Sequence, residues 1–280
     1  MKGEKLLITG GSGFLGSRLA DLAAGMGWRV CATWLTNRPQ FGPWVEVVRA
    51  DLRDRQATTR LVGEFKPAAV IHTAYSQNDR SVTWDGTLNL LEACLGLDLK
   101  PYFVYTSTDL VFDGRRRAYT ESDAPVPLMD YGRDKLETEG AVRSSALVSA
   151  VIRTSLMYDF SRVPRHLSFA VEAVRAGREC RLYADEFRSP VFVDDLARGL
   201  LGLVDLRFAG LLHMAGADRT DRYSFGLRLL KALGCPTDGV RPGEASASAQ
   251  MRPADCSLDS SKAEKLLGLR FRGVDELLGA

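Results

Sequence analysis

Tyr131 and Lys135 stand four residues apart in a segment that the sequence predicts to be helical, so both side chains project from one helix face. A free tyrosine has a pKa of about 10, which is too high for easy proton exchange at neutral pH. A lysine ammonium nearby favours the phenolate and lowers that pKa. The spacing therefore predicts that Tyr131 is a general acid, and an amphipathic surface pair is the alternative.

A second chemical signal is the glycine-rich string Thr9-Gly10-Gly11-Ser12-Gly13-Phe14-Leu15-Gly16. It follows the first expected strand and opens the first expected helix. Glycines there permit the tight turn, the approach of the backbone to a pyrophosphate and close packing of helix on strand. We expect the dinucleotide phosphates at the positive end of this helix, and a turn without a ligand is the alternative. The expected contacts are Gly10, Gly13, Phe14, Leu15 and Gly16.

The end of the second expected strand bears on which dinucleotide is bound. NAD-selective proteins of this kind carry a carboxylate there for the ribose 2′-hydroxyl, whereas Trp34 occupies that place here. No carboxylate would repel a 2′-phosphate, and Arg38 could pair with one. We therefore expect NADP(H) to be preferred. NAD(H) is the alternative if Arg38 is an ordinary exposed loop residue.

Further cofactor contacts are expected where the third and fourth strands end. Asp51 and Leu52 follow the third strand, where the adenine would be held, and Thr73 and Ala74 follow the fourth, beside the dinucleotide. His72 ends the fourth strand. We interpret it as a packing or hydrogen-bonding residue rather than a catalyst.

Short apolar runs alternate with longer helical segments over the first 150 residues. The expected strands are Lys5–Thr9, Arg29–Trp34, Val45–Arg49, Ala68–His72, Tyr102–Thr106 and Leu147–Arg153. The expected helices are Phe14–Met26, Gln56–Phe65, Val82–Leu97 and Tyr131–Ser144. This alternation predicts an α/β fold, a Rossmann-type doubly wound parallel sheet with helices on both faces.

The pattern loosens after about residue 154, where we expect a smaller C-terminal α/β subdomain that binds the substrate. Helices are expected near Arg165–Ala176, Asp194–Leu203 and Ser224–Leu233, and a loop over Gly243–Gln250. Residues 1–153 plus about 191–214 would form the dinucleotide-binding domain. Residues about 154–190 plus 215–280 would form the substrate-binding subdomain.

Composition narrows the class of protein. A chain of 280 residues that is 45% hydrophobic can bury a full core, and its net charge of +2 argues against nucleic acid as a partner. The five cysteines are scattered and form no CxxC pair, so they predict reduced thiols and neither disulfides nor a metal site. No apolar run is long enough for a membrane span, and the first residues do not resemble a signal peptide. We expect a cytoplasmic enzyme that binds no metal.

Several motifs resemble those of one family, the dTDP-4-dehydrorhamnose reductases, an extended branch of the short-chain dehydrogenases/reductases. Tyr105–Gly114 is similar to its STDxVFDG signature, and Tyr131–Glu137 to the first seven positions of its YGxxKLxxE segment. The resemblance continues, in family order, over Ile152–Ser155, Phe187–Pro190, Val193–Ala197 and Arg252–Asp259.

The resemblance implies a catalytic trio of Thr108, Tyr131 and Lys135. In family terms, hydride passes from the nicotinamide to a keto-sugar carbonyl, Tyr131 protonates the oxygen, and Thr108 hydrogen-bonds it. Lys135 would also hold the nicotinamide ribose. Asp109, Arg153 and Arg252 are further expected substrate contacts, with Arg252 on the diphosphate of a sugar nucleotide. The alternative for Arg252 is an ion pair with a neighbouring acid such as Asp255.

Two departures from the family bear on the substrate. Thr83 stands where the usual motif has Asn, and the loop Tyr75–Arg80 is shorter than in the rhamnose enzymes. The leading interpretation is an NADPH-dependent reductase of a nucleotide-linked 4-keto-6-deoxy sugar. One alternative is an NAD-dependent sugar-nucleotide epimerase or dehydratase. Another is a non-catalytic regulatory protein resembling the beta subunit of methionine adenosyltransferase. A homodimer stays open beside a monomer.

Overall fold

The computed structural model describes residues 3–247 and 251–279, which divide into two compact units. Unit 1 contains the described residues through Ser107, Arg133–Ile152 and Ala197–Leu212. Unit 2 contains Thr108–Gly132, Arg153–Leu196 and the described residues from His213 onward. The segment Thr108–Gly132 clusters with unit 2, although it lies inside the range expected for the dinucleotide-binding domain. The assignment of cofactor and substrate to separate domains stays a prediction.

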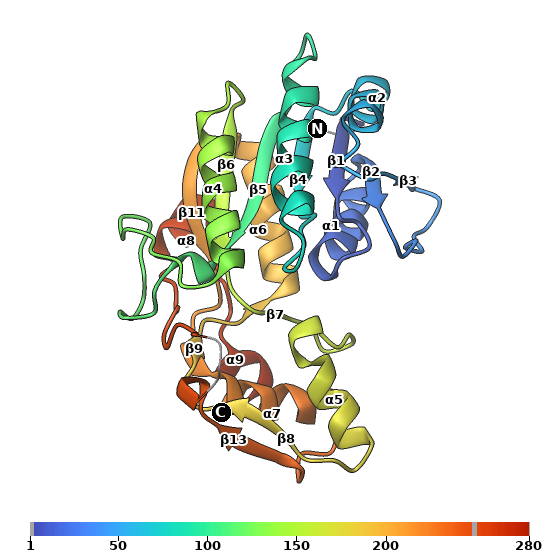
Figure 1. Cartoon of the computed structure of the whole chain (residues 1–280). Helices are drawn as coiled ribbons and strands as arrows, with labels where there is room; N and C mark the ends of the chain where they lie inside the picture. The colour runs from blue at the N-terminus through green and yellow to red at the C-terminus, as the bar shows by residue number, and fades with distance from the viewer. Residues whose placement is uncertain (1–2, 248–250, 280) are drawn as a thin grey trace. The chain divides into compact units, whose positions relative to one another are not determined.

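A seven-stranded sheet forms the centre of unit 1 (Figure 1), in the order β11-β6-β5-β4-β1-β2-β3. The pairs that join β3, β2, β1, β4 and β5 are parallel. This arrangement confirms the expected α/β fold with a Rossmann-type sheet. The strands are β1 (Lys5–Thr9), β2 (Arg29–Trp34), β3 (Val45–Arg49), β4 (Ala69–His72), β5 (Tyr102–Thr108), β6 (Ser149–Thr154) and β11 (Gly210–Met214).

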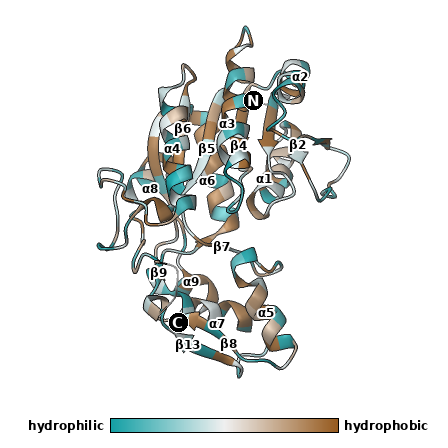
Figure 2. Ribbon diagram, in the orientation of Figure 1, coloured by the Kyte–Doolittle hydropathy of each residue, from teal (hydrophilic) through white to brown (hydrophobic). Residues whose placement is uncertain are grey.

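The central strands of the sheet are buried on both faces and are rich in apolar residues. All seven residues of β5 are buried, as are all four of β4, which is typical of parallel strands covered by helices. One face packs against α2 (Arg55–Phe65), α3 (Arg80–Leu95) and α4 (Asp130–Ser144) in a single hydrophobic cluster. Figure 2 shows the brown, hydrophobic colour concentrated along these strands. The core therefore holds the ends of the strands in fixed positions.

Local signals explain where the helices of unit 1 begin. Asp54 accepts a hydrogen bond from the backbone N–H of Ala57 and caps α2, and Asp79 caps α3 through Ser81. α1 (Phe14–Gly25) differs, because Gly13 precedes it and gives it no side-chain cap. Its first N–H groups therefore have no side-chain acceptor at the N-cap.

Unit 2 has its own hydrophobic core. α5 (Ser168–Arg175) and α7 (Arg222–Ala232) pack against β8 (Cys180–Tyr183), which pairs in parallel with β13 (Val240–Gly243). Gly226 of α7 faces β8 so closely that a Cβ there would lie 2.3 Å from a methyl carbon of Leu182. This core holds the loops that follow β8.

The other elements of the described chain are short or join the two units. They are β7 (Met157–Tyr158), β9 (Phe187–Arg188), β10 (Val191–Phe192), α6 (Val193–Leu206), β12 (Thr220–Asp221), α8 (Ser261–Leu267) and α9 (Val274–Leu278). Within the expected loop Gly243–Gln250, residues Ala245–Ala247 form a 3-10 turn and residues 248–250 lie outside the described residues. Of the helices described, none is both long and apolar enough to span a membrane.

Candidate functional site

The turn between β1 and α1 can be formed only by small residues. Gly10 has a φ of +71°, and the Gly13 N–H donates to the Gly10 carbonyl at 2.8 Å. A Cβ on Gly16 would lie 2.2 Å from that same carbonyl oxygen, so α1 packs directly on the turn. Of the remaining expected contacts, Phe14 is half-buried and Leu15 is buried. The uncapped start of α1 fits a pyrophosphate, because its first turn presents backbone N–H groups, and the exposed Gly13 adds no side chain in front of them.

Thr73 and Ala74 lie beside this turn, and their contact with the dinucleotide stays a prediction. The hydroxyl of Thr73 donates to the carbonyl of Thr9 at 2.7 Å, and a Cβ on Gly10 would lie 2.9 Å from the Cα of Ala74. The end of β4 therefore forms one wall of the glycine turn.

His72 is an interior hydrogen-bonding residue. Its Nδ1 lies 2.5 Å from the hydroxyl of Thr9, and its Nε2 lies 2.8 Å from the hydroxyl of Thr87 on α3. Burial, with the charge of Lys135, lowers the pKa of His72 to about 3. The neutral ring therefore ties β1, β4 and α3 together, which agrees with its interpretation as a packing residue.

Arg38 is exposed in the segment after β2, and the structure adds a second cation in this region. Arg49 on β3 pairs in register with Trp34, its guanidinium lies 5.8 Å from the centre of the Trp34 ring, and its Nε donates to the carbonyl of Leu35. Sequence reasoning missed Arg49 because only the pairing of β2 with β3 brings it to the end of β2.

Asp51 and Leu52 form a turn that α3 supports. The side-chain amide of Asn89 donates to the carbonyl of Leu52 at 2.9 Å. The Asp51 carboxylate accepts hydrogen bonds from Arg53, which lower its pKa. Asp51 is thus an ionised, partly exposed acid in this part of unit 1, and its contact with adenine stays a prediction.

Lys135 is deeply buried in unit 1 although it carries an ammonium group. Its Nζ donates to the carbonyl of Thr106 at 2.6 Å and lies 4.5 Å from the ring centre of Tyr105 and 5.3 Å from that of Tyr75. Burial lowers the pKa of Lys135 to about 7, and the charge of Glu139 acts against this effect. A lysine near its titration point is unusual away from functional sites.

Thr108 and Tyr131 both belong to unit 2, where a glycine brings their elements together. Gly132 follows Tyr131, and a Cβ there would lie 2.2 Å from the carbonyl oxygen of Leu110. The start of α4 therefore packs directly on the turn after β5, which Thr108 begins by accepting a hydrogen bond from the Leu110 N–H. Lys135 lies in unit 1, and the convergence of all three side chains stays a prediction.

Asp109 is buried and belongs to an ionic chain that runs through unit 2. It accepts a hydrogen bond from Ser155 at 2.6 Å, and its carboxylate lies 3.5 Å from the guanidinium of Arg188. Burial raises the pKa of Asp109, and Arg188 and Ser155 act against this effect. Arg188 continues the chain to Glu186 at 2.9 Å. From the sequence, Arg188 was noted only as part of the family motif Phe187–Pro190, and its two acidic partners were not predicted.

Glu186 gathers two more arginines. Arg252 donates to it from Nε at 2.6 Å, and Arg222 lies 3.3 Å away. Burial alone would raise the pKa of Glu186, but Arg188, Arg252 and Arg222 lower it to about 2. One buried carboxylate thus holds three guanidinium groups.

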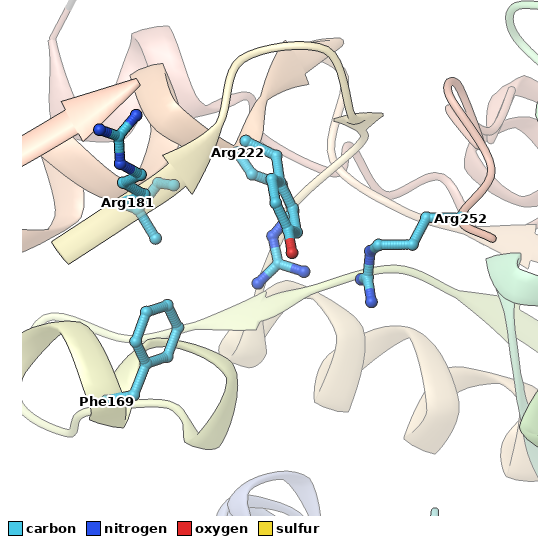
Figure 3. A pocket seen from close by; sticks show the side chains of 6 residues that line it. Phe169, Arg181, Arg222 and Arg252 are labelled. Carbon is cyan, nitrogen blue, oxygen red and sulfur yellow. The ribbon is translucent and has the colours of Figure 1, made fainter. Parts of the chain in front are cut away.

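Arg222 and Arg252 line a cleft of about 280 Å³ within unit 2 (Figure 3). Arg181 and the rings of Phe169 and Tyr183 line it as well, and Arg252 lies 5.4 Å from the centre of the Tyr183 ring. Cations beside aromatic rings suit an anionic ligand that carries an apolar or aromatic part. Of the residues expected to contact substrate, this cleft contains Arg252.

Arg153, another expected substrate contact, is only 2% exposed. It is the penultimate residue of β6, and its guanidinium lies 5.1 Å from the ring centre of Phe112. Its contact with substrate stays a prediction. Within the described part of the chain, no three His, Cys, Asp or Glu residues are grouped to hold a metal ion.

Comparison with protein families gives one match over nearly the whole chain. A family model described as the RmlD substrate binding domain matches residues 4–279. Among curated relatives, subunit beta of methionine adenosyltransferase 2 from Danio rerio is 29% identical, over 95% of this chain and 85% of that protein. A probable low-salt glycan biosynthesis reductase from Haloferax volcanii is 27% identical, over 98% of this chain and 95% of that protein.

Solved structures share the fold. A hypothetical dTDP-4-dehydrorhamnose reductase from Sulfolobus tokodaii has a TM-score of 0.82 and 27% identity, over 98% of both chains. A dTDP-4-dehydrorhamnose reductase from Bacillus anthracis, solved with NADP, has a TM-score of 0.82 and 22% identity, over 99% of this chain and 97% of that one. WbmH from Bordetella bronchiseptica, solved with NAD+, has a TM-score of 0.84 and 23% identity, over 99% and 96%. Structural relatives therefore bind NADP or NAD, and the resemblance expected from the motifs is confirmed.

Proposed function

Because the chain belongs to the family of the RmlD substrate binding domain, we propose that it is an NADPH-dependent reductase of a nucleotide-linked 4-keto-6-deoxy sugar. The observation that carries this proposal is the buried Lys135, one helical turn after Tyr131 on α4. A buried ammonium at that spacing lowers the pKa of a neighbouring phenol. A surface pair would leave Lys135 exposed.

The residues of the β1–α1 turn fit a dinucleotide. Side chains at Gly10 and Gly16 would collide with backbone, and the helix start lacks a side-chain cap. Arg38 and Arg49 supply two cations near the end of β2, which suits a ribose 2′-phosphate. We therefore assign NADP(H) as the cofactor. When bound, its nicotinamide supplies the hydride.

The chain's own part in the reaction is to move one proton and to hold the reacting oxygen. Tyr131 donates its phenolic proton to that oxygen as negative charge develops there. Thr108 offers a hydroxyl to the same atom, and its place at the end of β5 is held by the turn packed on Gly132. Lys135 stays charged below about pH 7 and stabilises the phenolate left on Tyr131.

The cleft of unit 2 supports a sugar nucleotide as substrate. Arg222 and Arg252 are oriented by Glu186, and Arg181 adds a third cation at its edge. The three arginines that line the cleft outnumber the one carboxylate that orients two of them, and a diphosphate would neutralise the excess positive charge. Phe169 and Tyr183 offer rings to the base or the sugar.

A second candidate function is that of a non-catalytic regulatory subunit. It is favoured by the relative from Danio rerio, which is named as a subunit of methionine adenosyltransferase. Against it stands the relative named as a reductase, which matches at similar identity. The two candidates differ in one measurable respect, because only an enzyme oxidises NADPH at the expense of a keto sugar.

The deciding experiment incubates the purified chain with NADPH and a dTDP-linked 4-keto-6-deoxy sugar. We expect NADPH absorbance to fall in proportion to the reduced sugar nucleotide, which chromatography would separate. Sugar conversion without net loss of NADPH would indicate the epimerase alternative. NADPH binding without any conversion, across several keto-sugar nucleotides, would favour the regulatory candidate.

A further inference from the structure

Helix α4 places a second buried charge one turn beyond Lys135. Glu139 is 1% exposed and Lys135 is 2% exposed, and residues four apart on a helix lie side by side. The hydroxyl of Ser107 donates to the Glu139 carboxylate at 2.5 Å, while the Lys135 ammonium donates to the Thr106 carbonyl. Two consecutive residues of β5 are thus held by two consecutive turns of α4.

The groups around Lys135 on the neighbouring elements are neutral. His72 on β4 has a pKa lowered to about 3, and burial raises the pKa of Tyr105 on β5 well above its ordinary value. Tyr75, in the segment after β4, contributes a ring. Neither histidine nor phenol therefore balances the ammonium at neutral pH.

The other acids on this part of α4 have partners of their own. Asp134 and Glu137 both pair with Arg80 of α3, and the Glu137 side chain is 53% exposed. Glu139 differs from them because it is buried beside Lys135, and its charge favours the ammonium form of that residue. Removing an opposite charge from the neighbourhood of a buried charge has large effects, because no water replaces it.

We propose that Glu139 is a positioning residue, whose buried carboxylate keeps the Lys135 ammonium charged and holds the end of β5 through Ser107. The inference rests on the proposed function, in which the Lys135 charge activates Tyr131. Glu139 itself moves no proton and contacts no substrate. It acts through Lys135 and through the strand that ends at Thr108.

The consequence is a shift in the pH range over which Lys135 carries its charge. In Glu139→Gln the amide still accepts the Ser107 hydrogen bond, but its negative charge is gone. The Lys135 titration midpoint should then fall by about one pH unit or more, as a nearby opposite charge commonly shifts a pKa by about 1–3 units. The matched control is Glu137→Gln, which removes the same charge from the exposed face of the same helix.

The test is an NMR titration of ¹³Cε-labelled lysine in the protein without ligands. The Lys135 signal is assigned by its loss in Lys135→Met. The spectrum needs to resolve only eight lysines, which are Lys2, Lys5, Lys66, Lys100, Lys135, Lys231, Lys262 and Lys265. We expect a lowered Lys135 midpoint in Glu139→Gln and a wild-type midpoint in Glu137→Gln. An unchanged midpoint in Glu139→Gln, or an equal shift in both variants, overturns the proposal.

Two additions keep the result decisive. Glu139→Asp retains the negative charge but moves it back by one methylene, so the Lys135 midpoint in this variant should lie between those of the wild type and Glu139→Gln. If Glu139→Gln does not fold, an unshifted Lys135 midpoint in Glu139→Asp overturns the proposal. The pH profile of kcat should follow the Lys135 midpoint. As the pH is raised, kcat should therefore begin to decrease at a lower pH in Glu139→Gln than in the wild type. If the wild type turns over no keto sugar, the proposed function fails, whereas the lysine titration still decides the role of Glu139.

Discussion

Arg252 donates two hydrogen bonds to the fully buried carboxylate of Glu186, from Nε at 2.6 Å and from Nη2 at 3.3 Å. The acid considered as its structural partner from the sequence, Asp255, instead accepts from Arg219 at 2.6 Å. A guanidinium has five N–H donors, so the bonds to Glu186 leave Arg252 able to bind a phosphate. Glu186 thereby fixes the position of a cation that lines the cleft.

Arg252→Ala should raise the Michaelis constant for a sugar nucleotide about tenfold or more, because a charge-assisted contact contributes roughly 1.5–3 kcal/mol. The melting temperature should also fall by a few degrees, since Glu186 loses one of three arginine partners. Steady-state kinetics and thermal unfolding measure both. Arg219→Ala, which breaks an ion pair outside the cleft, serves as control. A lower melting temperature with an unchanged Michaelis constant would show that Arg252 is purely structural.

Tyr131→Phe should lower turnover by about 10²–10⁴-fold, the usual cost of losing a positioned acid. NADPH affinity should stay near that of the wild type, because the proposed function assigns the dinucleotide to the glycine turn and Lys135. Turnover and fluorescence titration with NADPH give the two quantities. Tyr75→Phe is the matched control, since the Tyr75 ring lies near Lys135 but has no assigned proton. Near-normal turnover in Tyr131→Phe would assign the acid to another group.

The chain should bind NADPH at least about tenfold more tightly than NADH, because each contact of an arginine with a 2′-phosphate contributes roughly 1.5–3 kcal/mol. Alanine at Arg38 or Arg49 should weaken NADPH binding and leave NADH binding unchanged. Dissociation constants for both cofactors, measured on the wild type and the two variants, test this. Equal constants for NADPH and NADH in the wild type would contradict the assignment.

Gly16→Ala should destabilise the protein by about 1–3 kcal/mol and weaken NADPH binding, because the new Cβ would lie 2.2 Å from the backbone oxygen of Gly10. Gly63→Ala is the control. Gly63 lies inside α2 with no atom within 4 Å of a built Cβ, so alanine there should raise stability slightly. Urea unfolding distinguishes the two. Equal effects at both sites would mean that the packing of α1 on the turn is loose.

His72 should make the protein less stable in mild acid. The pKa of His72 is lowered to about 3 in the folded chain. Below the ordinary value of 6.5, His72 therefore binds a proton in the unfolded chain but stays neutral in the folded one. The stability from this group is full above pH 6.5 and is lost as the pH falls toward 3. Between pH 7 and 5 the wild type should lose about 2 kcal/mol more than His72→Gln. Urea unfolding at both pH values tests this, and parallel losses in the two proteins would count against it.

Local sequence determined the first strands of the fold and the places of the residues to which we assign its chemistry. The predicted strands Lys5–Thr9, Arg29–Trp34 and Val45–Arg49 match β1, β2 and β3, because apolar periodicity and glycine turns act over a few residues. The glycine string likewise lies at the start of α1, and Tyr131 and Lys135 share α4. These features need only helix and strand geometry, which neighbouring residues specify.

Tertiary structure alone decided which distant polar groups meet. Arg252 lies 66 residues from Glu186 in sequence and Ser107 lies 32 from Glu139, and no local pattern relates them. The two-residue strands β9 and β12 exist only because they pair with each other, since so short a segment carries no periodicity. Buried charges require partners from whichever segment the packed core brings near, so the bonds of Glu139 to Ser107 and of Glu186 to Arg252 became visible only once the chain was folded.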